Sequence, residues 1–389
     1  MSYNAYQLQQ NQQAVIVNLS EPISRDGGKY FAYQINGEDS EGKFEVFRRY
    51  SDFYFFRQLL TQRWPGCFIP PLPSKKILGN KDTKFLEDRR KFLIYFIDKI
   101  SQLPYIWYSE ENYSFIRNAS NLDFEKIVEK MKKHTMDDII NKYKTTFSYL
   151  SGKEINSELQ MKITYFKGFL KNSLVCLKKM KEFTKNLYET QGKFNQNFIN
   201  IISNTLPQYE KSNLAEFTQD QSLFLFINKA DVSKEIQDLT QQNEFQILYD
   251  MVRMELKEAE SFLEIIQQKE DYDEKINKAN LKIKSDQEEL SKLQAGKTTF
   301  KSLFSTGTKD DKIQKLQKLI EETRNELDNY YILIDLITII IAYLEIDKFK
   351  NEKSHRYYNV MNMLSRFQSS YNLKVNNFFI IFLLNFIVN

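Results

Sequence analysis

Helix-breaking residues are scarce in the longer, C-terminal part of this chain, and that scarcity limits its fold more than any other property of the sequence. The 269 residues beyond Ser120 contain one proline, Pro207, and five glycines. Because glycine and proline are the residues that most disfavour a helix interior, their near absence predicts long helices. The whole chain has 389 residues, of which 42% are hydrophobic, and is long enough for two or three domains.

A regular apolar pattern supports this expectation. An alternating spacing of three and four residues runs from Ile163 to Ile201, and nine of its twelve positions are apolar. The polar exceptions are Ser173, Thr184 and Gln191. Such a heptad pattern is typical of a coiled-coil seam.

Two interruptions divide the region into three predicted helices. We expect the first at residues 204–207, where Pro207 cannot donate a backbone hydrogen bond, and the second at 296–308, which holds two glycines. The second and third helices would then cover about residues 214–295 and 309–386. Helices of roughly 70–80 residues are about 100–120 Å long. They cannot bury all their apolar side chains against one another, so a symmetric dimer is expected.

The N-terminal part has a different pattern. Residues 14–50 alternate apolar and polar residues, and turn residues occur at Asp26–Gly28 and Asn36–Gly37. They predict a small antiparallel sheet of three strands. Ser51–Asp52 offers a helix cap, and a further helix is expected over about residues 84–102.

Basic residues concentrate in one short region of a nearly neutral chain. The net charge is +4, yet residues 48–91 hold 11 Lys and Arg against 4 Asp and Glu. Beyond Ser120 the count is 39 basic against 38 acidic. The small net charge argues against a nucleic-acid partner, whereas a local basic focus can recruit a compact anion such as a phosphorylated head group. The alternative is an ordinary solvated charged face.

Within this region, cations surround an aromatic residue. Arg49 ends a strand and can present two donors to one phosphate, beside Tyr50, whose ring can face a sugar-like ring. The proline run Ile69–Pro73 is extended and rigid, so it holds Lys75 in a fixed position. Arg89, on the next helix, can bond ring hydroxyls or a further phosphate. The set suits a singly phosphorylated inositol head group.

In this order the cluster resembles the PX (phox homology) domain, over residues 14–120. The motifs are Arg-Arg-Tyr-Ser-Asp-Phe, Pro-Pro-Leu-Pro-x-Lys and Phe-x-Glu-x-Arg-Arg. The resemblance implies that Arg49 binds the 3-phosphate of phosphatidylinositol 3-phosphate and that Tyr50 supports its inositol ring. It places Lys75 near the 1-phosphate and Arg89 near the 4- and 5-hydroxyls. Further candidate lipid contacts are Arg48, Lys76 and Arg90.

The helical part, residues 136–389, is similar to the BAR domain of PX-BAR sorting nexins, most clearly in the charged segment Asp347–Ser354. The expected fold is therefore an α+β PX domain followed by an all-α BAR domain of three long coiled-coil helices. The resemblance implies a curved homodimer, or a heterodimer with another sorting nexin, that meets anionic membrane and works with a retromer-type cargo complex. Candidate lysines at the tip of the helices are Lys297, Lys301, Lys309 and Lys312; solvated loop charge is the alternative.

Three short segments have predictions of their own. Residues 1–13 are polar and expected to be disordered. Residues 121–135 form a short amphipathic helix, which either wedges into the head-group layer or packs as a linker. The apolar run 378–388 either packs at the end of the last helix or belongs to a membrane-touching or irregular tail.

These patterns predict a peripheral membrane protein of endosomal sorting, which binds phosphatidylinositol 3-phosphate and senses or induces curvature as a dimer. The chain has two cysteines and two histidines: Cys67, Cys176, His134 and His355. Their spacing matches no recognisable catalytic or metal site, so neither an enzyme nor a cofactor is expected. A polar N-terminus and few cysteines favour the cytoplasm, on early endosome membranes. The competing hypothesis is a coiled-coil scaffold whose PX-like module binds a peptide.

Overall fold

The structure is a computed structural model, and it describes residues 15–73, 75, 83–118, 124–131, 134–219, 243–296 and 308–387. The chain forms two compact units, the first made of residues 1–170 with 257–347 and the second of residues 171–256 with 348–389. The division does not follow the boundary expected near residue 120. The α+β region forms the first unit together with the start of α8, most of α12, and all of α14.

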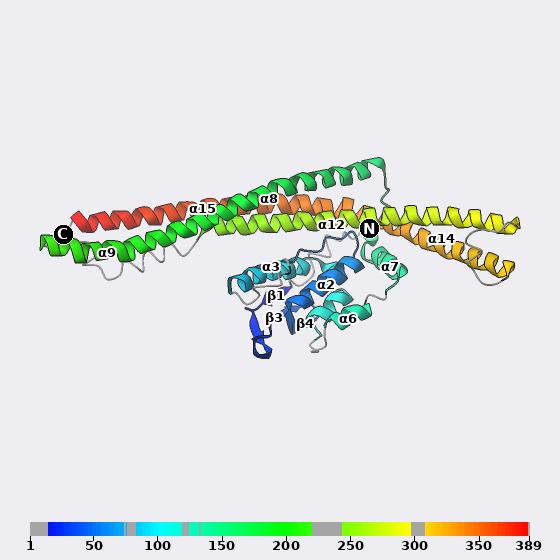
Figure 1. Ribbon diagram of the computed structural model, residues 1–389, viewed down its shortest axis with the longest axis horizontal. Helices are drawn as coiled ribbons and strands as arrows, with labels where there is room; N and C mark the ends of the chain where they lie inside the picture. The colour runs from blue at the N-terminus through cyan, green and yellow to red at the C-terminus, as the bar shows by residue number, and fades with distance from the viewer. Residues whose placement is uncertain are drawn as a thin grey trace. The chain divides into compact units, whose positions relative to one another are not determined.

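Four antiparallel strands form one sheet in the first unit (Figure 1). They are β1 (Ile16–Leu19), β2 (Ile23–Arg25), β3 (Tyr30–Asp39) and β4 (Gly42–Arg49). β1 and β2 pair with successive parts of one edge of β3, and β4 pairs with its other edge. The expected number of three strands is wrong by one, because residues 20–22 interrupt the first strand and Pro22 cannot donate to the ladder.

The two turn predictions have opposite outcomes. The turn at Asp26–Gly28 is confirmed, since all three residues have positive φ, from 50° to 86°. The turn at Asn36–Gly37 is wrong, because β3 continues through both residues. A Cβ atom on Gly37 would lie 2.0 Å from the carbonyl oxygen of Ile16. Gly37 therefore permits the close approach of β1 rather than a change of direction.

Helices cover the sheet and supply an aromatic core. They are α2 (Tyr50–Arg63), α3 (Thr83–Ser101), α4 (Pro104–Trp107), α5 (Glu110–Ile116), α6 (Phe124–Met131) and α7 (Met136–Thr146), with 3-10 turns η1 (Asp26–Gly28) and η2 (Ser148–Leu150). Phe53, Phe56 and Phe115 are fully buried, and the rings of Phe56 and Phe115 stack at 4.1 Å. Each such ring contributes about 1.5–3 kcal/mol by leaving water.

α6 belongs to this core. Phe124, Val128 and Met131 are at most 8% exposed, and the Phe124 ring lies 5.3 Å from that of Phe115. An apolar face already buried in protein is not available to lipid. Of the two alternatives for residues 121–135, the structure therefore supports the packed linker, for the residues that it describes.

Three long helical stretches follow, as predicted. The first comprises α8 (Ser157–Asn200), η3 (Ile201–Thr205), α9 (Leu206–Tyr209), η4 (Glu210–Leu214) and α10 (Ala215–Thr218); the second is α12 (Glu244–Gln294); the third comprises α14 (Lys309–Ile340), η5 (Ile341–Glu345) and α15 (Ile346–Ile387). The predicted break at residues 204–207 is wrong. η3 and η4 are π-helical, and the N–H of Leu206 bonds to the carbonyl of Ile201, five residues back. These wider turns carry the helix past Pro207, and it ends at Gln219, whose φ is 58°.

The loop after α2 joins the α+β region to the helices within the first unit. The Phe68 ring stacks on Phe262 of α12 at 4.2 Å, and the Phe68 N–H donates to Glu345 at 3.0 Å. The Gly66 N–H donates to Gln268 of α12 at 3.1 Å. The extended segment that follows, residues 69–73, is thus fixed at its start by contacts with α12 and η5.

Charged residues near the start of α15 form ion pairs with other helices of the same unit. In the first unit Lys162 Nζ lies 2.9 Å from Asp347 Oδ1. In the second unit Arg356 bonds to Glu255 at 3.0 Å, and Lys353 pairs with the same carboxylate. Along the described part of the chain, no helix is both long enough and apolar enough to cross a bilayer. α15 continues to Ile387, but the side chains of the run 378–388 lie outside the described ones.

Candidate lipid head-group site

Arg49 is placed by the junction between β4 and α2. It is the last residue of β4 and the N-cap of α2, and its N–H donates to Asp52 Oδ2 at 2.8 Å. The other oxygen of Asp52 accepts from Arg49 Nε at 3.2 Å. The Arg49 side chain is 41% exposed, whereas that of Asp52 is 10% exposed. The buried carboxylate therefore caps the helix and orients a guanidinium that solvent reaches.

Tyr50 connects this junction with the proline segment. Its hydroxyl donates to the carbonyl of Pro73, two residues before Lys75. Burial raises the pKa of Tyr50, so the phenol keeps the proton that it donates. The residue is 9% exposed. Its main structural effect is to hold the segment that carries Lys75 against α2.

Arg89 of α3 lies between two aromatic rings. Its guanidinium carbon is 4.2 Å from the centre of the Tyr50 ring and 4.4 Å from that of Phe85. The residue is 8% exposed, and burial lowers its pKa. A cation in this position covers one face of the Tyr50 ring. The structure thus brings Arg89 and Tyr50 together, with Arg89 buried against the ring.

Lys75 is a second exposed cation of the site. Its ammonium lies 5.4 Å from the centre of the Tyr54 ring, one helical turn after Tyr50. It lines the same pocket as Tyr50, whereas Arg49 is not among the lining residues of that pocket. Lys76 lies outside the described residues.

Two of the further candidates have other roles. Arg48 is 5% exposed, and its guanidinium donates to the carbonyls of Phe115 at 2.9 Å and Asn118 at 2.7 Å. Burial lowers its pKa to about 10, so it remains a cation at neutral pH. Arg90 donates to the carbonyls of Leu19 and Ser20, both at 2.9 Å. We therefore remove Arg48 from the candidate lipid contacts, because it is buried, and assign Arg90 to the β1–β2 loop.

A pocket of about 350 Å³ adjoins Tyr50 and Lys75. Its lining residues come from α2, the proline segment and α12: Tyr50, Tyr54, Arg57, Gln58, Pro71, Leu72, Pro73, Lys75, Lys257, Glu260, Ser261 and Glu264. Arg57 links the proline segment to α12 across the pocket. It donates to the Pro70 carbonyl at 2.8 Å and to Ser261 at 3.2 Å, and it pairs with Glu264. Sequence reasoning missed α12 here, because its residues lie about two hundred positions from Tyr50.

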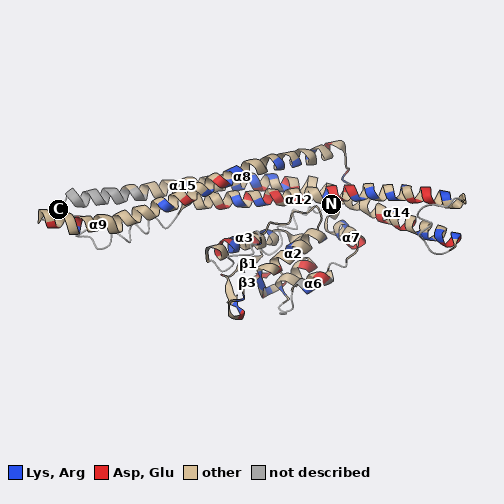
Figure 2. Ribbon diagram, viewed as in Figure 1, with Lys and Arg blue, Asp and Glu red and all other residues tan. Residues whose placement is uncertain are grey.

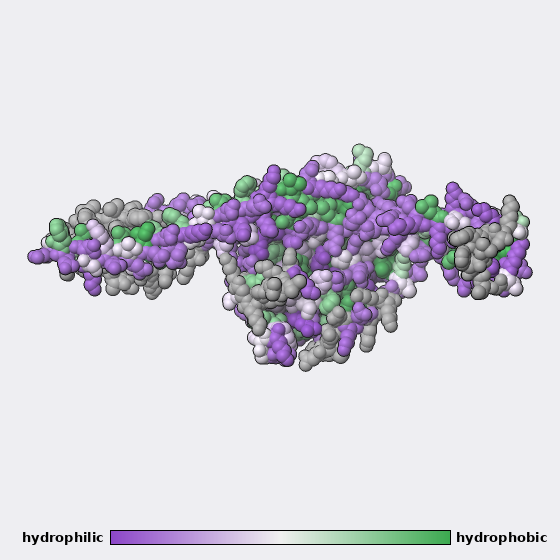
Figure 3. All heavy atoms as spheres, viewed as in Figure 1, coloured by the Kyte–Doolittle hydropathy of each residue, from purple (hydrophilic) through white to green (hydrophobic). Residues whose placement is uncertain are grey.

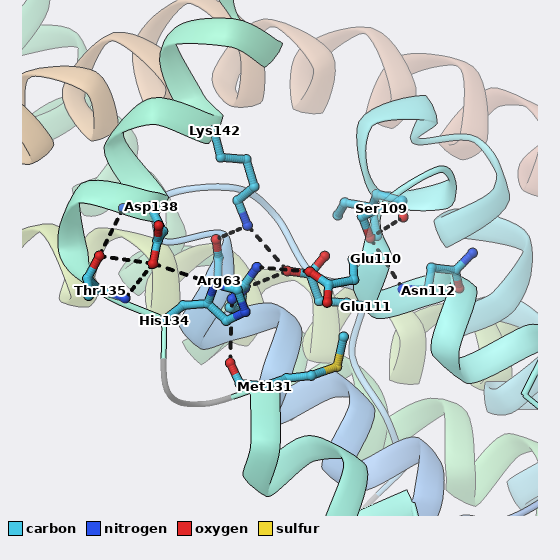
Figure 4. A network of polar contacts seen from close by, with 11 residues as sticks. Arg63, Ser109, Glu110, Glu111, Asn112, Met131, His134, Thr135, Asp138 and Lys142 are labelled. Carbon is cyan, nitrogen blue, oxygen red and sulfur yellow. Dashed lines mark hydrogen bonds and ion pairs between the residues drawn. The ribbon is translucent and has the colours of Figure 1, made fainter.

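A buried ionic network supports the site from the other end of α2 (Figure 4). Arg63 Nε donates to Glu111 Oε1 at 2.6 Å, and Lys142 Nζ lies 3.3 Å from the same oxygen. Burial opposes the charge of Glu111, but Lys142, its own backbone and Arg63 outweigh burial and lower its pKa. Arg63 also donates to the carbonyl of Met131 at 3.4 Å. The network ties α2, α5, α6 and α7 together.

The candidate tip lysines are only partly described. Lys297 and Lys301 lie outside the described residues. Lys309 and Lys312 are in the first turn of α14, together with Asp310 and Asp311. Figure 2 shows basic and acidic residues interspersed along α14. The described end of this helix therefore has no excess of basic charge.

Known proteins are similar to this chain in its N-terminal region and over most of its length. The PX domain family model matches residues 37–119. Over 80 residues, 21% of this chain and 13% of the relative, the chain is 41% identical to Vacuolar protein sorting-associated protein vps5 of Schizosaccharomyces pombe. Over 345 residues, 80% of this chain and 83% of the relative, it is 22% identical to Sorting nexin-4 of Eremothecium gossypii.

The fold comparison covers the helices as well. The cryo-EM structure of the SNX-BAR Mvp1 tetramer matches 95% of this chain and 100% of its own chain, with a TM-score of 0.58 and 18% identity. The chain thus contains a match to the PX domain and is similar to sorting nexins over most of its length. Arg49, Tyr50, Lys75 and Arg89 all fall within the residues that the PX family model matches. The likeness to the Mvp1 chain is one of fold.

Proposed function

We propose that this chain is a PX-BAR sorting nexin, that it binds phosphatidylinositol 3-phosphate on endosomal membranes through Arg49, Tyr50, Lys75 and Arg89, and that it takes part in endosomal sorting. The observation that carries the proposal is the exposed guanidinium of Arg49, which Asp52 orients at the start of α2. Arginine can bond to two phosphate oxygens at once. Lys75, held near Tyr50 by the Pro73 carbonyl, supplies a second positive charge. The role is one of binding rather than catalysis.

The helices support a dimer in this proposal. The seam residues Ile163, Phe166 and Leu170, in the first unit, are at most 5% exposed. Four seam residues in the second unit are exposed to between 38% and 55%: Met180, Leu187, Phe194 and Ile201. Figure 3 shows hydrophobic residues at the surface of the helical part on the face in view. Apolar rows of this kind are usually covered by another chain, and we propose that a second sorting nexin copy covers this one.

Such a dimer would carry two lipid sites. Two weak sites on one assembly bind a membrane far more tightly than either alone, because the second binding event is intramolecular. Preference for a curved membrane would follow from the shape of the dimer, and this part of the proposal rests on the likeness to PX-BAR proteins.

The proposal is tested by sedimenting the full chain with vesicles that differ in one lipid. Vesicles would contain phosphatidylinositol 3-, 4- or 5-phosphate, or phosphatidylserine at equal total charge, each at two diameters. We expect the 3-phosphate to retain the most protein. Equal retention on all vesicles of the same charge would show non-specific attraction instead, and absence of retention would favour a protein ligand.

A further inference from the structure

The pocket beside Tyr50 and Lys75 has a wall that does not belong to the PX domain. Four residues of α12 line it: Lys257, Glu260, Ser261 and Glu264. Two of these are carboxylates, and their side chains remain 40% and 41% exposed. They face the proline segment and the two tyrosines across a space of about 350 Å³. A carboxylate in this position accepts hydrogen bonds from hydroxyls and repels a second anion.

The charges of the wall are arranged in pairs. Lys257 Nζ lies 2.7 Å from Glu260 Oε2, and Arg57 pairs with Glu264. Lys75 adds a third cation to the lining, beside Arg57 and Lys257, against these two carboxylates. The pocket therefore has a single excess positive charge. That balance suits the one phosphate that Lys75 would hold, and a further phosphate in the pocket would meet the two carboxylates without a compensating cation.

Arg89 is not positioned to take part in this pocket. The PX resemblance gives Arg89 the task of reading the 4- and 5-hydroxyls, but the residue is 8% exposed behind the Tyr50 ring. The carboxylates that line the open pocket belong to α12.

We propose that Glu260 and Glu264 of α12 determine head-group selectivity, by accepting hydrogen bonds from inositol hydroxyls and excluding head groups with additional phosphates. The inference rests on the proposed lipid-binding function and extends it, because it assigns a specificity role to the BAR part of the chain. Glu260 is the residue to test, since Glu264 also holds Arg57 in place.

The test uses the full chain with soluble dibutanoyl phosphatidylinositol 3-phosphate and 3,5-bisphosphate, so that bilayer charge does not contribute. Affinities would be measured by calorimetry for the wild type, Glu260→Gln and the matched control Glu274→Gln. Glu274 is on the same helix, is paired with a lysine and is 63% exposed. We expect Glu260→Gln to reduce the preference for the monophosphate about three- to tenfold, chiefly by tightening the bisphosphate, since one repulsive charge is removed. Glu274→Gln should leave the ratio unchanged.

An unchanged ratio in Glu260→Gln, or the same change in Glu274→Gln, would overturn the role of α12. Arg49→Ala separates this outcome from failure of the proposed function. If Arg49→Ala abolishes binding while Glu260→Gln leaves the ratio unchanged, the lipid site stands and only the α12 inference is wrong. If neither ligand binds the wild type, both fail.

Discussion

At the scale of single residues, two adjacent arginines have opposite roles because a strand alternates its faces. Arg48 points to the same face as Phe44 and Val46, which are buried, and it satisfies backbone carbonyls there. Arg49 points to the other face and is exposed. The motif predicts Arg49 as a phosphate ligand, and the alternation of strand faces would have excluded Arg48. Its carbonyl partners, about seventy residues away, could not be predicted from local pattern.

The buried network around Glu111 predicts a specific loss of stability in acid. Because the pKa of Glu111 is lowered in the folded chain, its charge stabilises the fold above the ordinary value of 4.5. That contribution is lost as the pH falls through the lower folded value. We expect Glu111→Gln to reduce the free energy of unfolding by about 3 kcal/mol at neutral pH, since Arg63 and Lys142 lose their partner.

Denaturant titrations of both proteins at pH 7 and at decreasing pH below 4.5 measure this effect. The difference between wild type and Glu111→Gln should shrink toward zero in acid, where protonated Glu111 resembles glutamine. A difference that stays constant with pH would contradict the assignment of the stabilisation to this carboxylate.

At the scale of elements, local sequence identified most helices but not how they are joined. α3 was expected over residues 84–102 and is present over Thr83–Ser101, because an amphipathic pattern bounded by Leu103–Pro104 is a strong signal. Pro207 was expected to end a helix, yet π-helical turns on both sides accommodate it. Proline propensity is a local preference, and the pattern does not reveal the π-helical hydrogen bonding that accommodates Pro207.

The loop between α2 and the proline segment fits tightly against α14 at Gly66. Gly66 has φ of 84°, and a Cβ there would lie 2.9 Å from Ile337. Gly66→Ala should therefore reduce the free energy of unfolding by about 2–4 kcal/mol, from backbone strain plus the clash. Gly152 is a matched control, since its φ is 80° but no atom lies within 4 Å of its Cβ position.

Gly152→Ala should cost only about 1 kcal/mol, from strain alone. The two variants are compared by chemical denaturation, and Gly66→Ala combined with Ile337→Val should recover part of the loss. Equal effects of the two glycine substitutions would show that the contact with α14 is unimportant.

At the scale of the whole molecule, the exposed apolar seam of α8 requires a second chain to cover it. Phe194 of α8 is 55% exposed in the isolated protomer, although it occupies a seam position. Phe194→Glu should weaken the dimer at least tenfold, because a charge would replace a buried aromatic ring at the interface. Gln196→Glu introduces the same charge at an exposed position off the seam and should change the dissociation constant less than twofold.

Light scattering coupled to size-exclusion chromatography over a range of concentrations gives these constants. A wild-type chain that remains monomeric, or a dimer that tolerates Phe194→Glu, would contradict the proposed interface. The heptad pattern predicted that a partner is needed, since apolar positions outnumbered the surfaces available to cover them. It could not predict which positions are covered within the protomer, because that depends on how the three helices pack.

Binding to vesicles with phosphatidylinositol 3-phosphate, compared between wild type, Arg49→Ala and Arg49→Lys, tests the central claim most directly. Lys43→Ala, which removes an exposed cation from the same strand, is the control for total charge. If the guanidinium of Arg49 holds the phosphate by two bonds, Arg49→Ala should lose at least tenfold in affinity, and Arg49→Lys should recover little of it. Full binding by Arg49→Ala, or an equal loss in Lys43→Ala, would contradict the assignment of the lipid site.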